Sequence, residues 1–184
     1  MTRLLLATGN AHKAEEVQAI LGSGYEVEAR DPEVDETGDT FEENALLKAR
    51  ALAAATGALA VADDSGIEID HLGGAPGIHS ARWTDEGDWI PRVLRELDGV
   101  AVDGRGCRYV CAAVAVWPDG REVVLRGTVE GVIADAPRGT GGFGYDPIVI
   151  PVEADGRTFA ELTPDEKHAL SHRGRAFREL RSAL

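Results

Sequence analysis

Two adjacent carboxylates, Asp63 and Asp64, are the strongest sign of chemistry in this sequence. They follow the apolar residues 59–62 and precede Ser65 and Gly66, which predicts a position at a strand end, where ligands bind in open α/β sheets. Two carboxylates are costly to place near a core without a metal ion or a cation. Because successive strand residues face opposite ways, only one of the two is expected to enter any one site. The competing interpretation is a solvent-exposed turn.

A possible phosphate-binding turn joins a predicted strand to a predicted helix and consists of Thr8, Gly9, Asn10, Ala11, His12 and Lys13. With Asn10 as the N-cap, the N–H groups of Ala11 and His12 are expected to point out of the helix end, which attracts anions. A cation in the first turn opposes the helix dipole, so Lys13 favours a bound anion. A plain capped turn and an ion pair between Lys13 and Glu16 are the alternatives.

Glu43 is a third candidate, and its spacing alone indicates a structural role. It follows Thr40 by three residues, the spacing of a capping box. The carboxylate is therefore expected to cap the helix predicted at residues 40–56, unless other residues bring it into a site.

A glycine-rich stretch, residues 139–144, matches the dinucleotide pattern G-x-G-x-x-G. That pattern needs a helix directly after its last glycine, whereas Pro147 and the β-rich residues 148–150 follow here. The stretch is better explained as a flexible loop that brings Phe143 or Tyr145 against a planar ligand. A tight loop with core aromatics is equally compatible with these residues.

A basic cluster lies near the end of the chain, where Lys167, His172 and Arg173 surround Ser171. Basic helix surfaces are commonly just solvated. This one stands out because the chain is strongly acidic, and because His172 and Arg173 would begin a helix, the end that the dipole makes unfavourable for cations.

These candidates must be positioned by alternating strands and helices, followed by antiparallel strands and a helical end. The fold class is therefore α/β with a mixed central β-sheet flanked by helices. The predicted elements are a strand at 3–7, a helix at 14–21, a strand at 25–29, an acidic loop at 31–39, a helix at 40–56 closed by Gly57, strands at 59–62 and 66–69, a Gly- and Pro-rich loop at 72–83, a helix at 88–97, a hairpin of 108–117 and 122–129, a strand at 147–150 and helices from 163 to about 184.

Length and charge narrow the function further. The chain has 184 residues, which suits a single domain over 1–184. Its net charge of −13 disfavours nucleic-acid binding. No signal peptide or membrane span is evident. Cys107 and Cys111 lie four apart in a predicted strand, about 13 Å from each other, so they cannot form a disulfide, and a reducing, cytoplasmic compartment is expected.

Taken together, these segments resemble the inosine triphosphatase-like family, the noncanonical purine nucleoside triphosphate pyrophosphatases. The matching segments occur in the family's order over nearly the whole chain. They are Thr8-Gly9-Asn10 with Lys13, residues 40–45, Asp63-Asp64-Ser65-Gly66, residues 73–77, residues 141–147 and residues 161–174.

The resemblance implies two lobes with an active-site cleft between them, a homodimer, and Mg²⁺-dependent hydrolysis of ITP, dITP and XTP to the monophosphate and pyrophosphate, which cleanses the nucleotide pool. By position, Asp64 matches the family's general base, and Glu43 and Asp64 match its metal ligands. The family's phosphate-binding loop corresponds to Thr8, Gly9, Asn10, Ala11, His12 and Lys13. Its other substrate-binding residues correspond to Ser65, Phe143, Gly144, Tyr145, Asp146, Lys167, His172 and Arg173.

The residue chemistry agrees with these implied roles. Mg²⁺ and Lys13 would neutralise the triphosphate while Asp64 deprotonates a water that attacks the α-phosphorus. A keto oxygen at purine C6 can accept a hydrogen bond from Lys or Arg, whereas the amino group of adenine would leave those donors unpaired. The match is poorest over residues 83–102.

Three other functions are compatible with parts of the sequence. A catalytically idle nucleotide-binding protein would have little need for Asp64 beside Glu43 in an acidic site. A dinucleotide oxidoreductase rests only on the glycine pattern of residues 139–144. A pyrophosphatase for pyrimidine or modified nucleotides is not separated from the main hypothesis by these residues.

Overall fold

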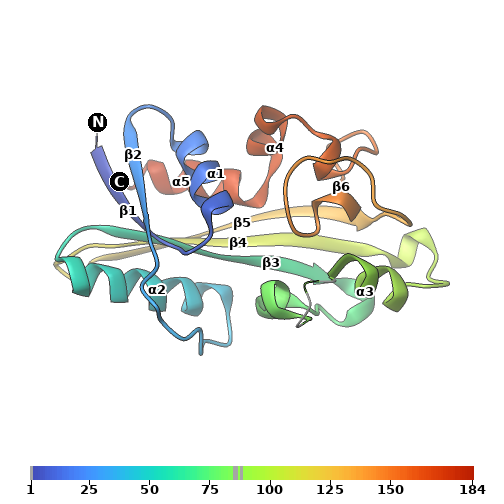
Figure 1. The fold of residues 1–184 in the computed structure, drawn as a ribbon, viewed down its shortest axis with the longest axis horizontal. Coiled ribbons are helices and arrows are strands. Elements are labelled where there is room, and N and C mark those ends of the chain that lie inside the picture. Colours follow the sequence, from blue (N-terminus) through green and yellow to red (C-terminus); the bar gives the residue numbers. More distant parts are fainter. Residues whose placement is uncertain (1, 85–86, 88) are drawn as a thin grey trace. The chain divides into compact units, whose positions relative to one another are not determined.

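The computed structural model describes residues 2–84, 87 and 89–184, and these residues form a mixed sheet flanked by helices (Figure 1). The strands lie in the order β2-β1-β3-β4-β5-β6. Strand β1 pairs in parallel with β2 and with β3, whereas β5 and β6 are antiparallel, so the predicted mixed sheet is confirmed. The strands are β1 (Thr2–Ala7), β2 (Tyr25–Arg30), β3 (Ala60–Ile69), β4 (Gly106–Val116), β5 (Glu122–Ile133) and β6 (Val149–Pro151).

The chain divides into two compact units, and the long strands β3, β4 and β5 contribute residues to both. Unit 1 comprises Met1–Ser65, Cys111–Gly127 and His172–Leu184, and unit 2 comprises Gly66–Val110 and Thr128–Ser171. The single domain over 1–184 and the cleft between two lobes stay predictions.

In unit 1, helices cover both faces of the strands. Helices α1 (Ala11–Leu21) and α5 (His172–Arg181) lie on one face, and α2 (Phe41–Thr56) lies on the other (Figure 1). Helix α2 begins one residue after the predicted start, because Thr40 is its N-cap, and it ends as predicted at Gly57, which has the left-handed conformation. The core between the strands and the α1–α5 layer contains Leu4, Leu6, Val17, Val61, Cys111, Ala176 and Phe177.

Unit 2 has its own core, between the far parts of the long strands and a set of short helices. This unit contains helices α3 (Trp89–Glu96) and α4 (Pro164–Leu170). It also contains short 3₁₀ segments, namely η1 (Asp70–Leu72), η2 (Gly77–Arg82), η3 (Val102–Gly104), η4 (Asp146–Ile148) and η5 (Phe159–Glu161). The buried residues of this core include Ile67, Ile69, Val93, Leu97, Tyr109, Tyr145 and Phe159.

The predicted position of the carboxylate pair, at the end of a strand, is wrong. The two strands predicted at 59–62 and 66–69 are a single strand, β3, which runs through Asp63 and Asp64. The pair therefore lies inside a strand and not at a strand end or in an exposed turn. A strand can carry charges at its centre when buried cations pair with them.

Smaller differences concern helix and strand ends. The strand predicted at 147–150 is the 3₁₀ segment η4 followed by β6, and part of the loop predicted at 72–83 is the 3₁₀ segment η2. Helix α5 ends at Arg181, short of the predicted end near 184. The helix predicted at 88–97 is α3, and its expected first residue, Asp88, lies outside the described residues, as do Asp85 and Glu86.

The predicted hairpin and the predicted free cysteines are both observed. Strands β4 and β5 are neighbours joined by a turn in which the Trp117 N–H donates to the Arg121 carbonyl at 2.9 Å. Cys107 and Cys111 are buried and free. Among the helices formed by residues 2–84, 87 and 89–184, none is long and apolar enough to cross a membrane.

Candidate active site

Asp63 is the centre of a buried charge cluster on the face of β3 that α1 and α5 cover. Its Oδ2 lies 3.1 Å from Lys13 Nζ and 3.1 Å from Arg173 Nη2. The Asp63 side chain is fully buried and that of Arg173 is 2% exposed. Lys13 comes from the first turn of α1 and Arg173 from the first turn of α5, so helix packing on the strands brings both cations to one carboxylate.

The Arg173 guanidinium has further acceptors within the same cluster. Its Nη1 donates to Glu16 Oε2 at 2.5 Å, and its Nη2 also donates to Ser65 Oγ at 2.8 Å. The alternative pairing of Lys13 with Glu16 is therefore wrong, because Glu16 pairs with Arg173 and Lys13 with Asp63. These contacts favour a supporting role for Arg173 over direct recognition of a base.

Opposing effects set the ionisation of this cluster. Burial alone raises the pKa of Asp63, but Lys13 and Arg173 outweigh burial and hold that pKa well below its usual range. Burial lowers the pKa of Arg173, but Asp63 and Glu16 outweigh it and raise that pKa. Asp63 and Arg173 therefore stabilise each other's charged forms, as the partners of a buried ion pair should.

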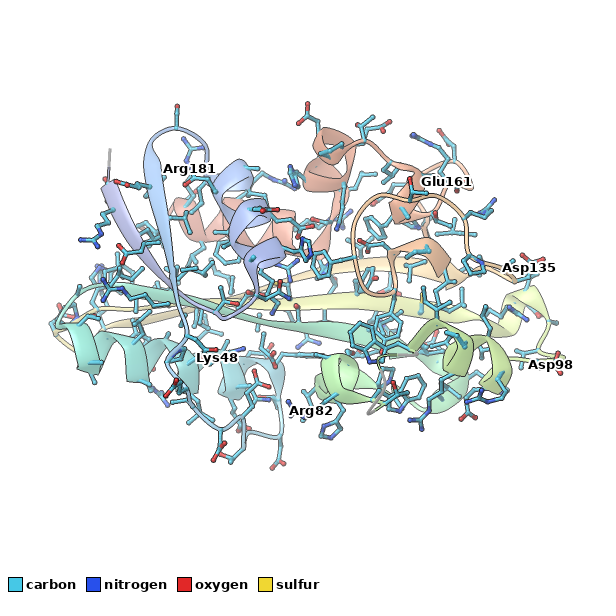
Figure 2. The ribbon with its side chains drawn as sticks, in the orientation of Figure 1. Lys48, Arg82, Asp98, Asp135, Glu161 and Arg181 are labelled. Carbon is cyan, nitrogen blue, oxygen red and sulfur yellow. The ribbon has the colours of Figure 1, made fainter. Side chains whose placement is uncertain are left out.

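Asp64 belongs to a different cluster, because adjacent strand residues have different partners. Lys48 Nζ, on α2, lies 3.4 Å from Asp64 Oδ1 and 2.8 Å from Glu36 Oε1 (Lys48 is labelled in Figure 2). The predicted opposite orientation of the two carboxylates agrees with this division between α1–α5 and α2. The other carboxylate oxygen, Asp64 Oδ2, is buried and has no hydrogen-bond partner within the part of the chain that the structure describes.

The environment of Asp64 suits a proton acceptor. Burial raises its pKa, and Lys48 and Lys13 oppose that rise, so the pKa stays above its ordinary value. A raised pKa brings a carboxylate closer to the range in which general bases work. Asp64 is 6% exposed, compared with 1% for Asp63.

Glu43 completes half of the predicted capping box at the start of α2. Its N–H donates to Thr40 Oγ1 at 3.1 Å, as predicted, but its carboxylate accepts from the Asp39 N–H at 2.7 Å and not from Thr40. The preceding acidic loop is held in the same way, because the Gly38 N–H donates to the buried Asn44 Oδ1 at 2.8 Å. Glu43 therefore has an anchored carboxylate with one oxygen committed to the loop.

No cluster of three or more His, Cys, Asp or Glu side chains that could hold a metal ion exists among the described residues. The residues present fit an ion that is only partly held by protein. Asp64 offers a buried oxygen without a donor, and Glu43 is anchored near the start of α2. Mg²⁺ is commonly bound in this way, by one or two carboxylates together with substrate phosphates and water.

The predicted phosphate-binding turn is a capped helix start. Asn10 Oδ1 accepts from the His12 N–H at 3.0 Å and from the Lys13 N–H at 3.3 Å, and Thr8 Oγ1 accepts from the Asn10 N–H. The N-cap prediction is confirmed, but the His12 N–H points to the cap and not outward. Gly9, Asn10, Ala11 and His12 are exposed, whereas Thr8 and Lys13 are partly buried.

In unit 2, Asp146 gathers the residues of the predicted base-binding loop. Its Oδ2 accepts from Lys167 Nζ at 2.7 Å and from the Phe143 N–H at 2.8 Å. Lys167 Nζ also lies 4.6 Å from the centre of the Phe143 ring. Tyr109, on β4, donates its hydroxyl to Asp146 Oδ1 at 3.1 Å. A cation, an aromatic ring and a fixed carboxylate are thus held together.

Tyr145 follows the alternative interpretation, that of a core aromatic. Its hydroxyl donates to the Ser80 carbonyl at 2.8 Å, and its ring stacks on Trp89 with centroids 5.8 Å apart. Burial raises the pKa of this hydroxyl. Phe143 is the half-buried aromatic of the loop, next to Gly144.

His172 begins α5 beside a position in β5 where no side chain fits. A Cβ on Gly127 would overlap the His172 carbonyl oxygen and the Ala176 nitrogen. Glycine at this position therefore lets the start of α5 approach the strand closely.

The structure thus brings some of the predicted residues into three groups, whereas Glu43, Tyr145 and His172 have other neighbours. Lys13, Ser65 and Arg173 surround Asp63; Asp64 pairs with Lys48; and Phe143 and Lys167 contact Asp146. Sequence reasoning missed four residues in these groups, which are Glu16 as the partner of Arg173, Glu36, Lys48 and Tyr109.

Comparisons with known proteins identify a family and several relatives. The model of the Ham1 family matches residues 4–183. A protein from Symbiobacterium thermophilum named "dITP/XTP pyrophosphatase" is 54% identical over 181 residues, covering 95% of this chain and 90% of the relative. One of the same name from Streptomyces coelicolor is 52% identical over 192 residues, covering 98% and 96%.

Solved structures agree with these sequence matches. A HAM1 protein from Coxiella burnetii has a TM-score of 0.85 at 37% identity and covers 100% of this chain and 98% of its own. The Ham1 protein of Staphylococcus aureus has a TM-score of 0.84 at 38% identity and covers 99% and 97%. The resemblance stated from the sequence is confirmed.

Proposed function

The chain belongs to the Ham1 family, and on this premise we propose that it hydrolyses noncanonical purine nucleoside triphosphates, such as ITP, dITP and XTP, to the monophosphate and pyrophosphate. The relatives named dITP/XTP pyrophosphatase align over nearly their whole length with this chain, which supports the proposal. The structural observation that carries it is Asp64, a buried carboxylate with a raised pKa, a lysine on one oxygen and no partner on the other within the described structure.

Asp64 is the proposed general base. It orients a water molecule and removes its proton as the water oxygen attacks the α-phosphorus, and pyrophosphate leaves. Lys48 fixes Oδ1 and moderates the pKa rise that burial causes, so the carboxylate is available at neutral pH. Asp63 has two cations on Oδ2, and they hold its pKa well below the ordinary range, which makes it a poor proton acceptor although its Oδ1 has no hydrogen-bond partner among the described residues.

Glu43 and Asp64 are the proposed ligands of a divalent metal ion, for which we propose Mg²⁺. The ion, when bound, supplies charge neutralisation for the triphosphate and for the leaving pyrophosphate. Glu43 retains one oxygen beyond its bond to the Asp39 N–H, and Asp64 retains Oδ2. Both residues therefore have an oxygen available for an ion that the phosphates help to hold.

The turn from Thr8 to Lys13 is the proposed triphosphate-binding loop. The exposed N-terminus of α1 and the Lys13 ammonium offer positive charge to phosphate oxygens. An anion there competes with Asp63 for Lys13, and Arg173 remains with Asp63 when Lys13 turns to the phosphates. We extend the proposal to Ser65 and His172 as substrate contacts of unit 1.

The residues around Asp146 form the proposed base-binding part. Phe143 presents a ring for stacking, Gly144 and Tyr145 shape the loop, and Lys167 offers N–H donors that a C6 keto oxygen accepts. Adenine carries an amino group at C6, which would leave these donors unpaired. Rejection of adenine nucleotides follows from that mismatch.

Three further parts of the proposal concern the setting of the enzyme. The two free cysteines favour a reducing compartment, for which we propose the cytoplasm. The net charge of −13 argues against nucleic acid as a partner. A homodimer is proposed from the resemblance alone.

A panel of nucleoside triphosphates tests the function. The purified chain is incubated with ITP, dITP, XTP, GTP, ATP and dUTP, with and without Mg²⁺, and pyrophosphate and monophosphate are measured. Equal amounts of the two products, preference for the keto purines and dependence on the metal ion are expected. Tight binding of ITP without pyrophosphate release would instead identify a nucleotide-binding protein without catalysis. Preference for dUTP would move the substrate class to pyrimidines.

A further inference from the structure

The Tyr109 hydroxyl is buried beside the base-binding residues without belonging to any motif of the sequence. We propose that Tyr109 is a positioning residue, which fixes Asp146 and through it Lys167, and thereby sets how tightly the enzyme binds a keto purine. The inference rests on the proposed function, because it deepens the role of the group around Asp146.

Core packing holds the Tyr109 side chain in place. The residue lies on β4, is 6% exposed, and its ring contacts that of Phe159 with centroids 5.4 Å apart. From this fixed ring the hydroxyl reaches Asp146 Oδ1 at 3.1 Å. Burial, with Asp146 as a second cause, raises the pKa of the hydroxyl well above its ordinary value, so it remains a donor at every working pH.

The two carboxylate oxygens of Asp146 accept from different donors. The Tyr109 hydroxyl is therefore needed to fix the orientation of this carboxylate. Oδ2 accepts from Lys167 Nζ and from the Phe143 N–H, both at less than 3 Å, while Oδ1 accepts from Tyr109. A carboxylate held at one oxygen can turn about its Cβ–Cγ bond. A donor on each oxygen removes that freedom, so the lysine and the loop amide meet an acceptor of fixed orientation.

The orientation of the Asp146 carboxylate affects which purine base the site selects. Lys167 lies over the Phe143 ring while its Nζ donates to Asp146, so its remaining hydrogens point in directions that the carboxylate determines. Hydrogen bonds to a keto oxygen require that alignment. Tyr109 does not need to touch the substrate, and its contribution is the orientation of the group that does.

Tyr109→Phe tests the proposal because it removes one oxygen atom and keeps the ring packed against Phe159. We expect KM for ITP to rise about 3- to 10-fold with kcat changed less than about twofold, and the kcat/KM ratio of ITP to ATP to narrow by a similar factor. The control is Val93→Ala, which removes apolar atoms from the same buried core and no hydrogen bond. It should lower the melting midpoint and leave KM unchanged.

A double-mutant cycle asks whether Tyr109 acts through Lys167. In a Lys167→Met background, Tyr109→Phe should produce no further change in KM, because the group that it positions is gone. If the effects of Tyr109→Phe and Lys167→Met on KM multiply in the double variant, the proposal is overturned. So would a Tyr109→Phe variant with a lowered melting midpoint, the wild-type KM and the wild-type ITP-to-ATP ratio, because that result describes a merely structural hydroxyl.

Replacement of Tyr109 by p-aminophenylalanine supplies a second variant that retains a donor at the end of the ring. It should restore most of the KM lost in Tyr109→Phe, and failure to restore it in a folded protein counts against the proposal. The unaltered chain is assayed in parallel. If it releases no pyrophosphate from ITP, the proposed function has failed, whereas an active unaltered chain with unaffected variants refutes only the role of Tyr109.

Discussion

Lys13, the last residue of the segment proposed to bind phosphates, forms an ion pair with Asp63 on β3, with 3.1 Å between Nζ and Oδ2. The lysine side chain is 15% exposed and that of the aspartate is completely buried. The cation is therefore neutralised by the protein before any phosphate arrives. Because Arg173 donates to the same oxygen, Asp63 keeps a cationic partner when Lys13 moves to a substrate.

Lys13→Ala should weaken the binding of a triphosphate more than that of the monophosphate product. The ammonium meets phosphate in the ground state and the transition state alike, so KM for ITP should rise by about tenfold or more with a smaller change in kcat. Steady-state kinetics with ITP and product inhibition by IMP measure the two effects. Equal loss of affinity for both nucleotides would contradict contact with the β- or γ-phosphate.

Asp64→Asn should retain the fold and lower kcat by roughly 10²–10⁴, the usual contribution of a positioned general base. The amide is close to isosteric with the carboxylate, so the melting curve should change little. Near-normal turnover in the folded variant would assign the base elsewhere. Asp63→Asn provides the comparison, because it disturbs the ion pairs with Lys13 and Arg173. This variant should lower the melting midpoint more than Asp64→Asn does, and it should lower kcat less.

Lys48→Met should move the acid limb of the kcat/KM profile to higher pH. Burial raises the pKa of Asp64 and Lys48 lowers it, so removal of the cation leaves the effect of burial less opposed. The base then becomes protonated at a higher pH than in the unaltered enzyme. Arg50→Met is the matched control, because Arg50 is a cation of the same helix that pairs with Glu122 instead. Its profile should coincide with that of the parent.

Arg173→Ala should reduce activity on ITP and on ATP in parallel and lower the melting midpoint. The substitution leaves Asp63 and Glu16 buried without their arginine, and removal of one partner of a buried pair costs about 3–5 kcal/mol. The sequence alone predicted a base-reading arginine, for which the loss would be selective for ITP. If the ratio of kcat/KM for ITP to that for ATP narrows while the melting midpoint is unchanged, Arg173 recognises the base.

The pH dependence of stability should carry the signature of Asp63. Its folded-state pKa lies below the unfolded value of about 4, so its contribution is complete above that value and is lost as pH falls below it. Urea unfolding at pH 7 and at pH 3 measures the loss. In Asp63→Asn the dependence over that interval should be shallower, and an unchanged slope would show that other carboxylates dominate acid unfolding.

Much of unit 1 was predictable because its local signals agree with its fold. Thr40 and Gly57 mark the two ends of α2, and Asn10 marks the start of α1. The error at Asp63 and Asp64 has a clear cause. Adjacent charges ordinarily interrupt a buried strand, and the cations that permit them here come from other elements. Lys48 is 16 positions from Asp64, and Arg173 is 110 positions from Asp63.

The missed residues share a physical reason. Glu16 was weighed only as a neighbour of Lys13, since its partner Arg173 is 157 positions away along the chain. Tyr109 sits in an apolar strand, where a hydroxyl gives no sign of the carboxylate that it will meet. Lys48 resembles any lysine of a helix until the fold places it beside Asp64. Long-range pairing of this kind leaves no local pattern.

The continuous run of β3 through its two carboxylates makes this segment sensitive to chain length. Insertion or deletion of a single residue just before Asp63 would shift the register by one and turn each following side chain to the opposite face. Asp63 would then face Lys48 on α2. Asp64, the proposed base, would face Lys13 and Arg173 instead. A change in the number of residues before Asp63 therefore disturbs both carboxylates at once, whereas the turn at residues 118–120 can absorb insertions without such an exchange.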